Sequence, residues 1–305
     1  MKTRLTRNRL AAVLSVWALG LTLTACGGDP TEGEQSATDT ITVGSAAFPE
    51  NEIIAEIYAQ ALEAKDIKVE KKLNIGAREA YIPALENGEI DLLPEYTGNL
   101  LLYVDKNATA TSPEDVVNAL DDALPEGLEV LGAAKAEDKD SLNVTSEFSE
   151  QEGVKSIADL KKIDGLKVGA NPEFKERPYG VPGMEKVYGI TGIEFTAISD
   201  SGGPATLKAL LDGKVDVANI YSTTPSIVEN DLVTLEDPEN MIAAQNVIPL
   251  INSDKATDEV KEVLDGISAE LTTEDLLDLN GKNQGEDKTA PAELAKQWLT
   301  DKGLI

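Results

Sequence analysis

The sequence predicts a two-lobed α/β protein, and three observations support this fold class. Short apolar strands alternate with helical segments from Ile41 onwards, a pattern typical of sheets whose strands are mostly parallel. One motif occurs twice with identical spacing, an Ala-Leu pair followed by Gly, Asp and Tyr, over residues 84–97 and 209–222. The chain ends in a run of helical segments, which must bury their apolar faces against an earlier part of the chain. We therefore expect two α/β lobes, between which the chain crosses twice.

The first half of the chain supplies the elements of one predicted lobe. Its strands are short apolar runs that stop at a Gly or a polar residue, and its helices carry apolar residues at helical spacing. Ser112 and Pro113 begin one helix, because Ser is a favoured N-cap and Pro is favoured at the first helical position. The predicted strands are 41–44, 73–75 and 128–131, and the predicted helices are 52–64, 78–86 and a segment that begins at 113.

The second half repeats the alternation and then becomes helical. Pro204 and Pro291 mark helix starts, Gly281 marks a helix end, and Ser156 with Asp159 forms a capping-box pattern. The predicted strands are 166–169, 193–198, 215–221, 232–235 and 246–251, and the predicted helices are 204–211, 257–271, 273–280 and a last one from 291.

Two extended apolar segments are the candidates for the crossings between the lobes. They are Leu142–Ser146 on the outward path and Asn246–Ile251 on the return. The first lobe then comprises 41–142 plus 250–305, and the second comprises 143–249. A hinge of two crossing segments allows the lobes to close around a ligand.

The N-terminus has the pattern of an export signal. Basic residues precede an apolar run, and residues 1–25 are predicted to be a lipoprotein signal peptide. The run closes with Leu-Thr-Ala before Cys26, which resembles a bacterial lipobox and predicts lipidation of Cys26. Residues 26–40 are polar and predict a flexible tether, so the protein is expected to be lipid-anchored on the extracytoplasmic face of the cell membrane. The alternative is an ordinary signal peptide with an incidental Cys.

Composition argues against several classes of function. With 27 Lys and Arg against 55 Asp and Glu, the formal net charge of −28 repels nucleic acid. The chain has no His, which is the commonest metal ligand and general base. It also lacks the Gly-x-Ser-x-Gly motif of many hydrolases. We therefore expect no enzyme, no metal, no other cofactor and no nucleic-acid partner.

The duplicated motif places a Tyr at the end of a strand in each lobe. These residues are Tyr96 and Tyr221. In open α/β sheets ligands bind at the carboxyl ends of the strands, so the motif predicts a ligand held between two aromatic rings. The alternative is that both Tyr residues only pack in the core.

These motifs resemble one known family, the solute-binding proteins of ABC importers for glycine betaine, choline, carnitine and proline betaine. The resemblance covers residues 41–305, with the matching motifs at 41–50, 84–98, 174–189 and 210–225. It implies a type II periplasmic-binding-protein-like fold. It also implies a monomeric receptor that delivers a small zwitterionic or cationic solute to the transmembrane subunits of an ABC permease. In that family a cage of Tyr rings surrounds a quaternary ammonium group through cation–π attraction.

The resemblance assigns individual site residues. Tyr96 and Tyr221 match cage residues, Asn99 occupies a position that tunes ligand choice, and Arg177 lies near a carboxylate-binding Arg of some members. Further members of the predicted site are Ser45, Phe48, Thr97, Tyr179, Gly202 and Thr223. Gly202 precedes a helix N-terminus, whose backbone N–H groups favour an anion. For Gly202 a plain turn is the alternative.

Three family positions lack the expected side chain. Ala46 stands where relatives often carry a Lys or Gln for the carboxylate, and Ser141 and Ser199 stand where further rings are expected. Phe48 and Tyr179 lie in matching loops and could replace those rings. A receptor for a different small metabolite, with a reshaped cage, is therefore the alternative function.

Overall fold

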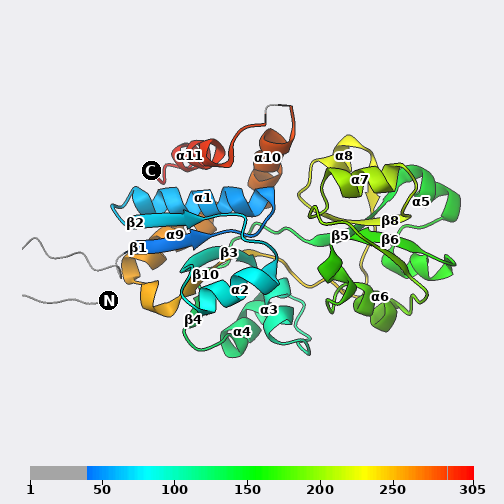
Figure 1. The fold of residues 1–305 in the computed structure, drawn as a ribbon, viewed down its shortest axis with the longest axis horizontal. Coiled ribbons are helices and arrows are strands. Elements are labelled where there is room, and N and C mark those ends of the chain that lie inside the picture. Colours follow the sequence, from blue (N-terminus) through cyan, green and yellow to red (C-terminus); the bar gives the residue numbers. More distant parts are fainter. Residues whose placement is uncertain (1–39, 287) are drawn as a thin grey trace, which may run out of the picture. The chain divides into compact units, whose positions relative to one another are not determined.

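The computed structural model of this chain describes residues 40–286 and 288–305. The predicted signal peptide, Cys26 and all of the predicted tether except Thr40 lie outside the described residues. Two five-stranded sheets organise the described part, and helices cover both of them (Figure 1).

The first sheet has the strand order β2-β1-β3-β10-β4. Strand β1 pairs in parallel with β2 and β3, and β10 pairs antiparallel with β3 and β4. The strands are β1 (Thr40–Gly44), β2 (Lys68–Lys72), β3 (Leu92–Tyr96), β4 (Leu128–Val130) and β10 (Val247–Asn252). The sequence prediction put a strand at 73–75 instead of β2. The observed strand is a mostly exposed edge rich in Lys, so it lacks the apolar signal on which the prediction depended.

The helices of the first lobe form two layers, one on each face of this sheet. One layer contains α1 (Pro49–Glu63), α9 (Asp258–Glu270), α10 (Thr273–Gln284) and α11 (Pro291–Asp301). The other contains α2 (Arg78–Glu86), α3 (Thr97–Val104) and α4 (Pro113–Ala123). Successive side chains of a strand point to opposite faces, so Leu92 packs in the first layer and Leu93 in the second.

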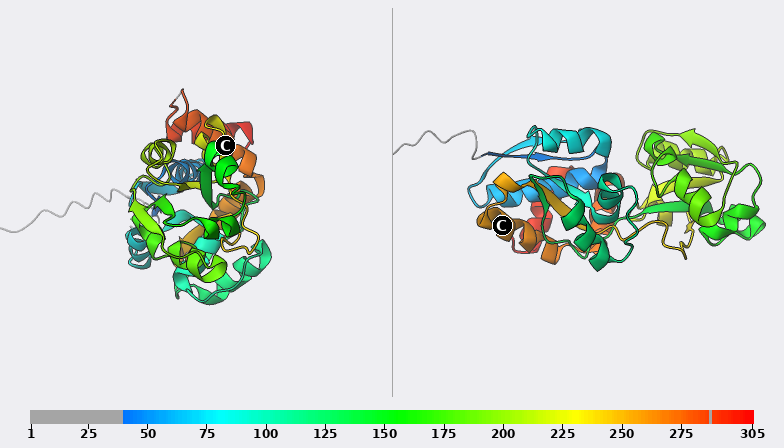
Figure 2. Two further views of the ribbon diagram at one scale, coloured as in Figure 1. Left: turned by 90° about the vertical axis from the view of Figure 1, so that its right-hand side faces the viewer. Right: turned by 90° about the horizontal axis from the view of Figure 1, so that it is seen from below.

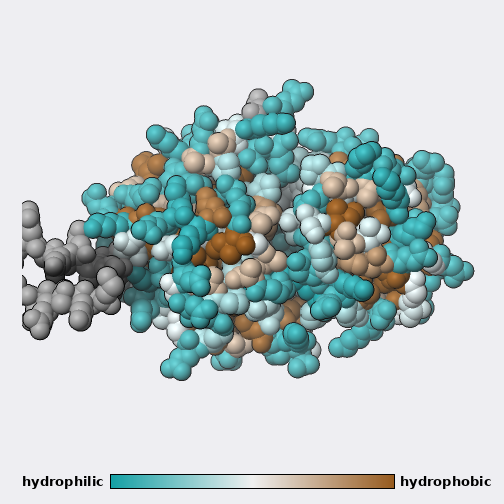
Figure 3. All heavy atoms as spheres, in the orientation of Figure 1, coloured by the Kyte–Doolittle hydropathy of each residue, from teal (hydrophilic) through white to brown (hydrophobic). Residues whose placement is uncertain are grey.

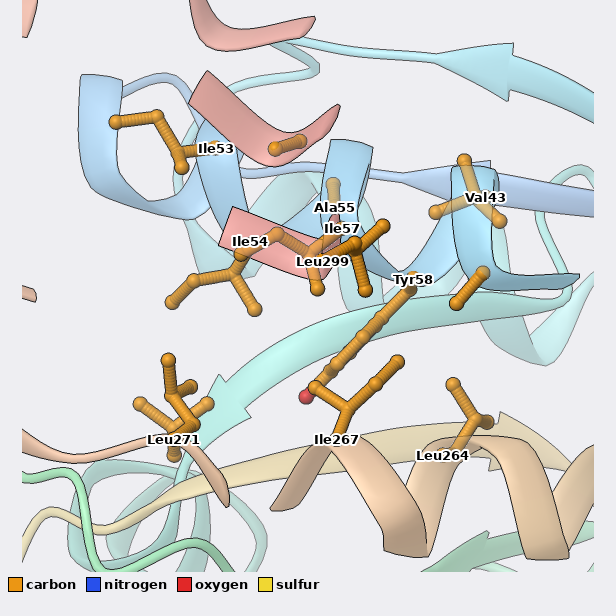
Figure 4. Packing of buried hydrophobic residues seen from close by; sticks show 14 of the residues in the cluster. Val43, Ile53, Ile54, Ala55, Ile57, Tyr58, Leu264, Ile267, Leu271 and Leu299 are labelled. Atoms are coloured by element: carbon orange, nitrogen blue, oxygen red, sulfur yellow. The ribbon is translucent and has the colours of Figure 1, made fainter. Parts of the chain in front are cut away.

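The C-terminal helices pack directly on α1. Figure 4 shows Ile54, Ile57 and Tyr58 of α1 facing Ile267 of α9 and the neighbouring Leu271. All five side chains are at most 1% exposed. Their apolar contacts hold the C-terminal segment against the first sheet.

The second sheet has the order β7-β6-β8-β5-β9 and the same mixture of parallel and antiparallel pairs. Its strands are β5 (Asp140–Thr145), β6 (Lys167–Ala170), β7 (Glu194–Ala197), β8 (Val217–Tyr221) and β9 (Leu232–Thr234). Its helices are α5 (Ser146–Glu152), α6 (Val181–Tyr188), α7 (Pro204–Leu211) and α8 (Ser226–Glu229), with 3-10 turns η2 (Ile157–Lys162) and η3 (Pro172–Lys175). A further 3-10 turn, η4 (Ser253–Lys255), follows β10.

The duplicated motif is explained by equivalent positions in the two sheets. Gly88 and Gly213 end a helix with φ of +69° and +67°, a left-handed conformation that favours glycine. Asp91 then accepts a hydrogen bond from the Thr42 N–H of β1 at 2.8 Å. Asp216 accepts one from the Lys167 N–H of β6 at 2.9 Å. The repeat therefore encodes the same helix-to-strand turn in each lobe and carries a Tyr to each strand end.

The crossings between the sheets differ from the prediction. Leu142–Ser146 and Asn246–Ile251 fall largely within β5 and β10, which are buried strands of the two sheets. The predicted lobe boundaries after residues 142 and 249 therefore cut through strands. The prediction took extended apolar segments for linkers, but an apolar run of this length is also what a buried strand requires.

The connecting segments are 131–139 and 235–246, which Figures 1 and 2 show between the two sheets. Backbone hydrogen bonds join them. Ala134 N donates to Val247 O at 2.8 Å, and Asp138 N donates to Gln245 O at 3.1 Å. The strands that follow, β5 and β10, enter their new sheets antiparallel to a neighbour. For this reason both sheets are mixed, whereas the sequence predicted mostly parallel sheets.

Hydrophilic side chains cover most of the face shown in Figure 3, in agreement with the strongly acidic composition. Among the residues that the structure describes, the exposed large apolar ones are Val187, Leu211, Val228, Leu277 and Ile305, which are spread over different parts of the chain.

Candidate ligand-binding site

A cavity of about 220 Å³ lies between residues of the two lobes. Side chains from the start of α1, the start of α2 and the end of β3 line it on one side. Side chains from the start of β5, from the end of β8 and from the segments after β6 and β7 line it on the other. The lining residues are Ala46, Ala47, Phe48, Gly76, Ala77, Arg78, Tyr81, Tyr96, Asn99, Asp138, Asp140, Asn171, Pro172, Glu173, Arg177, Ser199, Asp200, Ser201 and Tyr221.

Three aromatic rings meet in this cavity. Phe48 is the N-cap residue of α1, Tyr96 ends β3, and Tyr221 ends β8 in the other lobe. The Phe48 ring centroid lies 5.9 Å from that of Tyr96 and 5.3 Å from that of Tyr221. The structure therefore brings together the two Tyr residues of the duplicated motif and the predicted replacement ring Phe48.

Glu50 holds the hydroxyl group of Tyr96. The Tyr96 hydroxyl donates to Glu50 Oε1 at 2.7 Å, and both residues are buried. Burial raises the pKa of Tyr96, and the neighbouring charge of Glu50 raises it further, so the hydroxyl keeps its proton. This bond fixes the orientation of the ring.

Arg78 and Glu95 form a buried ion pair beside the rings. Arg78 Nε and Nη2 donate to the two Glu95 oxygens at 2.7 Å each, and the Tyr81 hydroxyl donates to Glu95 Oε1 at 2.8 Å. Burial by itself would lower the pKa of Arg78, but the charge of Glu95, the hydrogen bonds that it accepts from Arg78 and the neighbouring Tyr81 and Tyr179 together outweigh this effect, so the pKa is raised. Arg78 Nη1 makes no hydrogen bond within residues 40–286 and 288–305, so a ligand could accept one from it.

Asn99 connects the lobes on another side of the cavity. Its Nδ2 donates to Asp140 Oδ2 at 2.7 Å, and its Oδ1 accepts from Gln245 Nε2 at 2.7 Å. Asn99 belongs to α3, Asp140 begins β5, and Gln245 lies in the returning connection. The predicted Asn99 thus lines the cavity and lies at the junction of both connections.

Arg177 also lines the cavity, but its guanidinium group has other partners. Nη1 donates to the Tyr179 hydroxyl at 3.0 Å, and Nη2 donates to Glu79 Oε2 at 3.2 Å. Tyr179 itself is 2% exposed and packs in the second lobe, and burial raises its pKa to about 12. A second, larger cavity of about 520 Å³ includes Tyr179 and Tyr103 and shares Arg78, Asn99, Glu173 and Arg177 with the first.

The remaining predicted site residues do not line the first cavity. Ser45 Oγ accepts from Asn74 N at 2.8 Å, and Thr97 Oγ1 donates to Ala244 O at 3.1 Å. Thr223 Oγ1 donates to Glu50 Oε2 at 2.5 Å. Gly202 has φ of +73° and lies against the backbone of β8, while its neighbour Ser201 lines the cavity.

Of the three positions without the family side chain, two border the cavity. Ala46 and Ser199 line it, whereas Ser141 is buried and donates its hydroxyl to Ile220 O at 2.6 Å. None of the three has an aromatic ring or a long side chain with a hydrogen-bond donor. The aromatic rings that line the cavity are therefore those of Phe48, Tyr81, Tyr96 and Tyr221.

Several charged residues at the site were missed by the sequence reasoning. Arg78 was taken as an ordinary helix start, although its partner Glu95 was visible as a charge inside the apolar strand Leu92–Tyr96. Asp138 and Asp140 follow the alternating Ala134 and Ala136, and this period of two was the available signal for an extended buried segment.

Within residues 40–286 and 288–305 there is no group of three or more His, Cys, Asp or Glu residues that could hold a metal ion. Across the same residues no helix is both long enough and apolar enough to cross a membrane.

The sequence of this chain matches a known protein family. Residues 39–301 match the family described as the substrate binding domain of the ABC-type glycine betaine transport system. The chain belongs to this family. The predicted resemblance is therefore confirmed.

Individual relatives are similar over nearly the whole chain. The glycine betaine-binding protein YehZ of Escherichia coli (strain K12) is 27% identical over 306 residues, which is 95% of this chain and 98% of that protein. The carnitine transport binding protein OpuCC of Listeria monocytogenes serotype 1/2a is 25% identical over 87% of each chain. The crystal structure of a glycine betaine/carnitine/choline ABC transporter protein has the same fold, with a TM-score of 0.67, 20% identity and coverage of 87% of this chain and 99% of that one.

Family membership establishes the general role. The protein is an extracytoplasmic substrate-binding protein of an ABC transporter with a type II fold, and it is not an enzyme. Its two lobes, with a cavity between them, have the organisation that such a receptor requires.

Proposed function

We propose that this protein binds a quaternary-ammonium solute of the betaine or choline type in the cavity between its lobes. The observation that carries the proposal is the set of three rings, Phe48, Tyr96 and Tyr221, contributed to one cavity by both lobes. A quaternary ammonium has no N–H to donate, so ring faces are its natural partners, each contributing about 0.5–2 kcal/mol. Family membership supports the same ligand class.

The charged lining complements such a ligand. Asp138 and Asp140 line the cavity, and the ionised carboxylate of either residue attracts a cation. A ligand carboxylate, where there is one, has Arg78 Nη1 as a donor that protein groups leave free within the described chain. The predicted carboxylate partner Arg177 already donates to Tyr179 and Glu79, so we propose Arg78 for this contact.

Isothermal titration of the purified protein tests this function. We expect millimolar or tighter binding for at least one of glycine betaine, choline, carnitine and proline betaine. The neutral isostere of choline, 3,3-dimethylbutan-1-ol, has the same shape without the charge and is expected to bind at least tenfold more weakly. Absence of heat with all four quaternary ammonium compounds would refute the ligand class and favour a different metabolite. A ligand that co-purifies with the protein could then be identified by mass spectrometry.

We further propose that Cys26 is lipidated and anchors a monomeric receptor to the membrane surface. The lipobox-like sequence before Cys26 supports the lipid anchor. In a cell fractionation, the wild-type protein is expected in the membrane pellet and Cys26→Ala in the soluble extracytoplasmic fraction. Equal membrane association of both proteins would contradict the anchor.

A further inference from the structure

Two buried carboxyl groups, Glu50 and Asp138, lie behind the rings of the cavity. Glu50 belongs to the first turn of α1 and is 3% exposed. Asp138 belongs to the outward connection 131–139, is 6% exposed and lines the cavity. Charged carboxylates are rarely buried without a cation, so this pair requires an explanation.

Hydrogen-bond donors surround both groups. Glu50 accepts from the Tyr96 hydroxyl at 2.7 Å, from Thr223 Oγ1 at 2.5 Å and from Asn280 Nδ2 at 2.6 Å. Asp138 Oδ1 accepts from the Thr223 N–H at 3.1 Å and from Ser222 Oγ at 3.2 Å. Thr223 therefore donates to both carboxyl groups, which places them next to each other.

The charges around the pair do not neutralise it. Among residues 40–286 and 288–305, no Lys or Arg forms an ion pair with Glu50 or Asp138. The acidic and phenolic groups that face the pair and the cavity are Tyr96 of β3, Asp140 of β5, Glu173 of η3, Asp200 after β7 and Tyr221 of β8. The cations that face the cavity are Arg78 of α2 and Arg177 after η3. Glu137 and Lys139 are adjacent to Asp138 in the chain. Arg78 is paired with Glu95, Arg177 with Glu79 and Lys139 with Glu137.

This environment places one proton on the pair. Burial raises the pKa of Asp138 well above its ordinary value, and the charge of Glu50 raises it further. Burial also raises the pKa of Glu50, but the donors Thr223, Tyr96 and Asn280 oppose that rise. We infer that the free protein has the negative charge on Glu50, which accepts three hydrogen bonds from neutral donors, and the proton on Asp138.

We propose that the Glu50–Asp138 pair exchanges its proton for the cation of the bound ligand. The inference depends on the proposed function, because it requires a cationic ligand among the rings. The cavity has a volume of about 220 Å³, which suits a small solute, and Asp138 is part of its lining. A cation bound in the cavity therefore lies close to Asp138. Its positive charge favours the ionised carboxylate. On binding, the Asp138 O–H bond breaks, the proton passes to water, and the carboxylate keeps the electron pair and faces the cation.

The exchange makes affinity depend on pH in a defined direction. Because binding releases a proton, raising the pH strengthens binding, by up to tenfold per pH unit for one whole proton released. The rise ends once the free protein has also lost this proton. A ligand without a charged ammonium group, such as 3,3-dimethylbutan-1-ol, gains nothing from the ionisation, so its affinity does not rise with pH.

The number of protons released can be measured directly. Choline and glycine betaine would be titrated calorimetrically into the full chain at several values between pH 6 and pH 9, in phosphate and in Tris, whose ionisation enthalpies differ. We expect wild type to release a measurable fraction of one proton for each ligand bound and to gain affinity as the pH rises. Asp138→Asn is expected to release none and to show affinity that does not vary with pH. Glu50→Gln is expected to release its proton at lower pH, because Asp138 then ionises without a neighbouring negative charge.

Each result separates this inference from the proposed function. Binding of choline by wild type without proton release between pH 6 and pH 9 would overturn the exchange and leave the function standing. Equal release by Asp138→Asn would also overturn it. Absence of any binding of quaternary ammonium ligands would overturn both.

A ligand-free measurement tests the proton on the pair independently. A carboxyl group whose folded-state pKa exceeds its unfolded value of about 3.9 contributes stability below that value and loses it as the pH rises through the folded pKa. Between pH 5 and pH 8 the Tm of wild type is therefore expected to fall further than that of Asp138→Asn. Parallel Tm profiles for the two proteins would overturn the buried shared proton.

Discussion

Glu95→Ala is expected to lower the free energy of unfolding by about 3–5 kcal/mol, because it leaves the cation of Arg78 buried and unpaired. Glu95 is fully buried and accepts four hydrogen bonds, two from Arg78, one from the Tyr81 hydroxyl and one from the Tyr96 N–H. Each of these donors would lose its partner where water has little access. Urea unfolding followed by circular dichroism measures the loss.

A matched control comes from a surface ion pair whose N···O distance is the same as that of Arg78 and Glu95. Asp278 accepts from Lys282 at 2.7 Å on the surface of α10, and Asp278→Ala is expected to cost no more than about 0.5–1 kcal/mol. Adding Arg78→Met to Glu95→Ala should recover part of the larger loss, because it removes the unpaired charge. If the double variant is no more stable than Glu95→Ala, the loss arises from the cavity rather than from the charge.

Tyr221→Ala is expected to weaken binding of a quaternary ammonium ligand by about 5–30-fold, because the second lobe loses its ring. The Tyr221 hydroxyl makes no hydrogen bond to any residue that the structure describes, so it holds no buried partner in place. Tyr221→Phe keeps the ring and is expected to change affinity less than about threefold. Isothermal titration with the tightest ligand of the series measures both variants.

Tyr103→Ala distinguishes the two cavities. Tyr103 lines the larger cavity of about 520 Å³ and not the smaller one. If the ligand lies among Phe48, Tyr96 and Tyr221, Tyr103→Ala leaves its affinity unchanged. A large loss in Tyr103→Ala together with none in Tyr221→Ala would place the ligand in the larger cavity and refute the ring cage.

Local patterns in the sequence predicted many of the helices and strands, because the start and end of such an element depend on residues that are close together in the chain. Helix 78–86 and helix 204–211 were predicted with the bounds that α2 and α7 have, since a Gly or Pro marks their ends. The edge strand β2 was missed, because KVEKK carries no apolar alternation. β2 pairs with β1 through backbone hydrogen bonds. Every residue type except Pro can donate and accept such bonds, so the pattern of side chains does not reveal the pairing.

In the candidate site, too, the sequence predicted some features and not others. The duplicated motif predicted Tyr96 and Tyr221, and the resemblance added Phe48, Asn99 and Arg177, all of which line the cavity. The resemblance also suggested Thr97 and Ser45, but their hydroxyl groups hydrogen-bond to the backbone outside the cavity. A motif identifies the strand end at which a residue lies, whereas the direction of its side chain depends on neighbours distant in the chain.

The amino-acid sequence alone was sufficient to predict the fold class, the family and three rings that line the cavity, Phe48, Tyr96 and Tyr221. Periodicity, helix ends, a repeated turn and family motifs can all be recognised from residues that are close together in the sequence. Folding in three dimensions was needed to show that β5 and β10 are strands rather than linkers. It was also needed to bring Arg78 to Glu95, and Glu50 to Asp138 and Thr223. These partners lie 17 to 173 residues apart, and a buried charge acquires its partner only when the chain has folded.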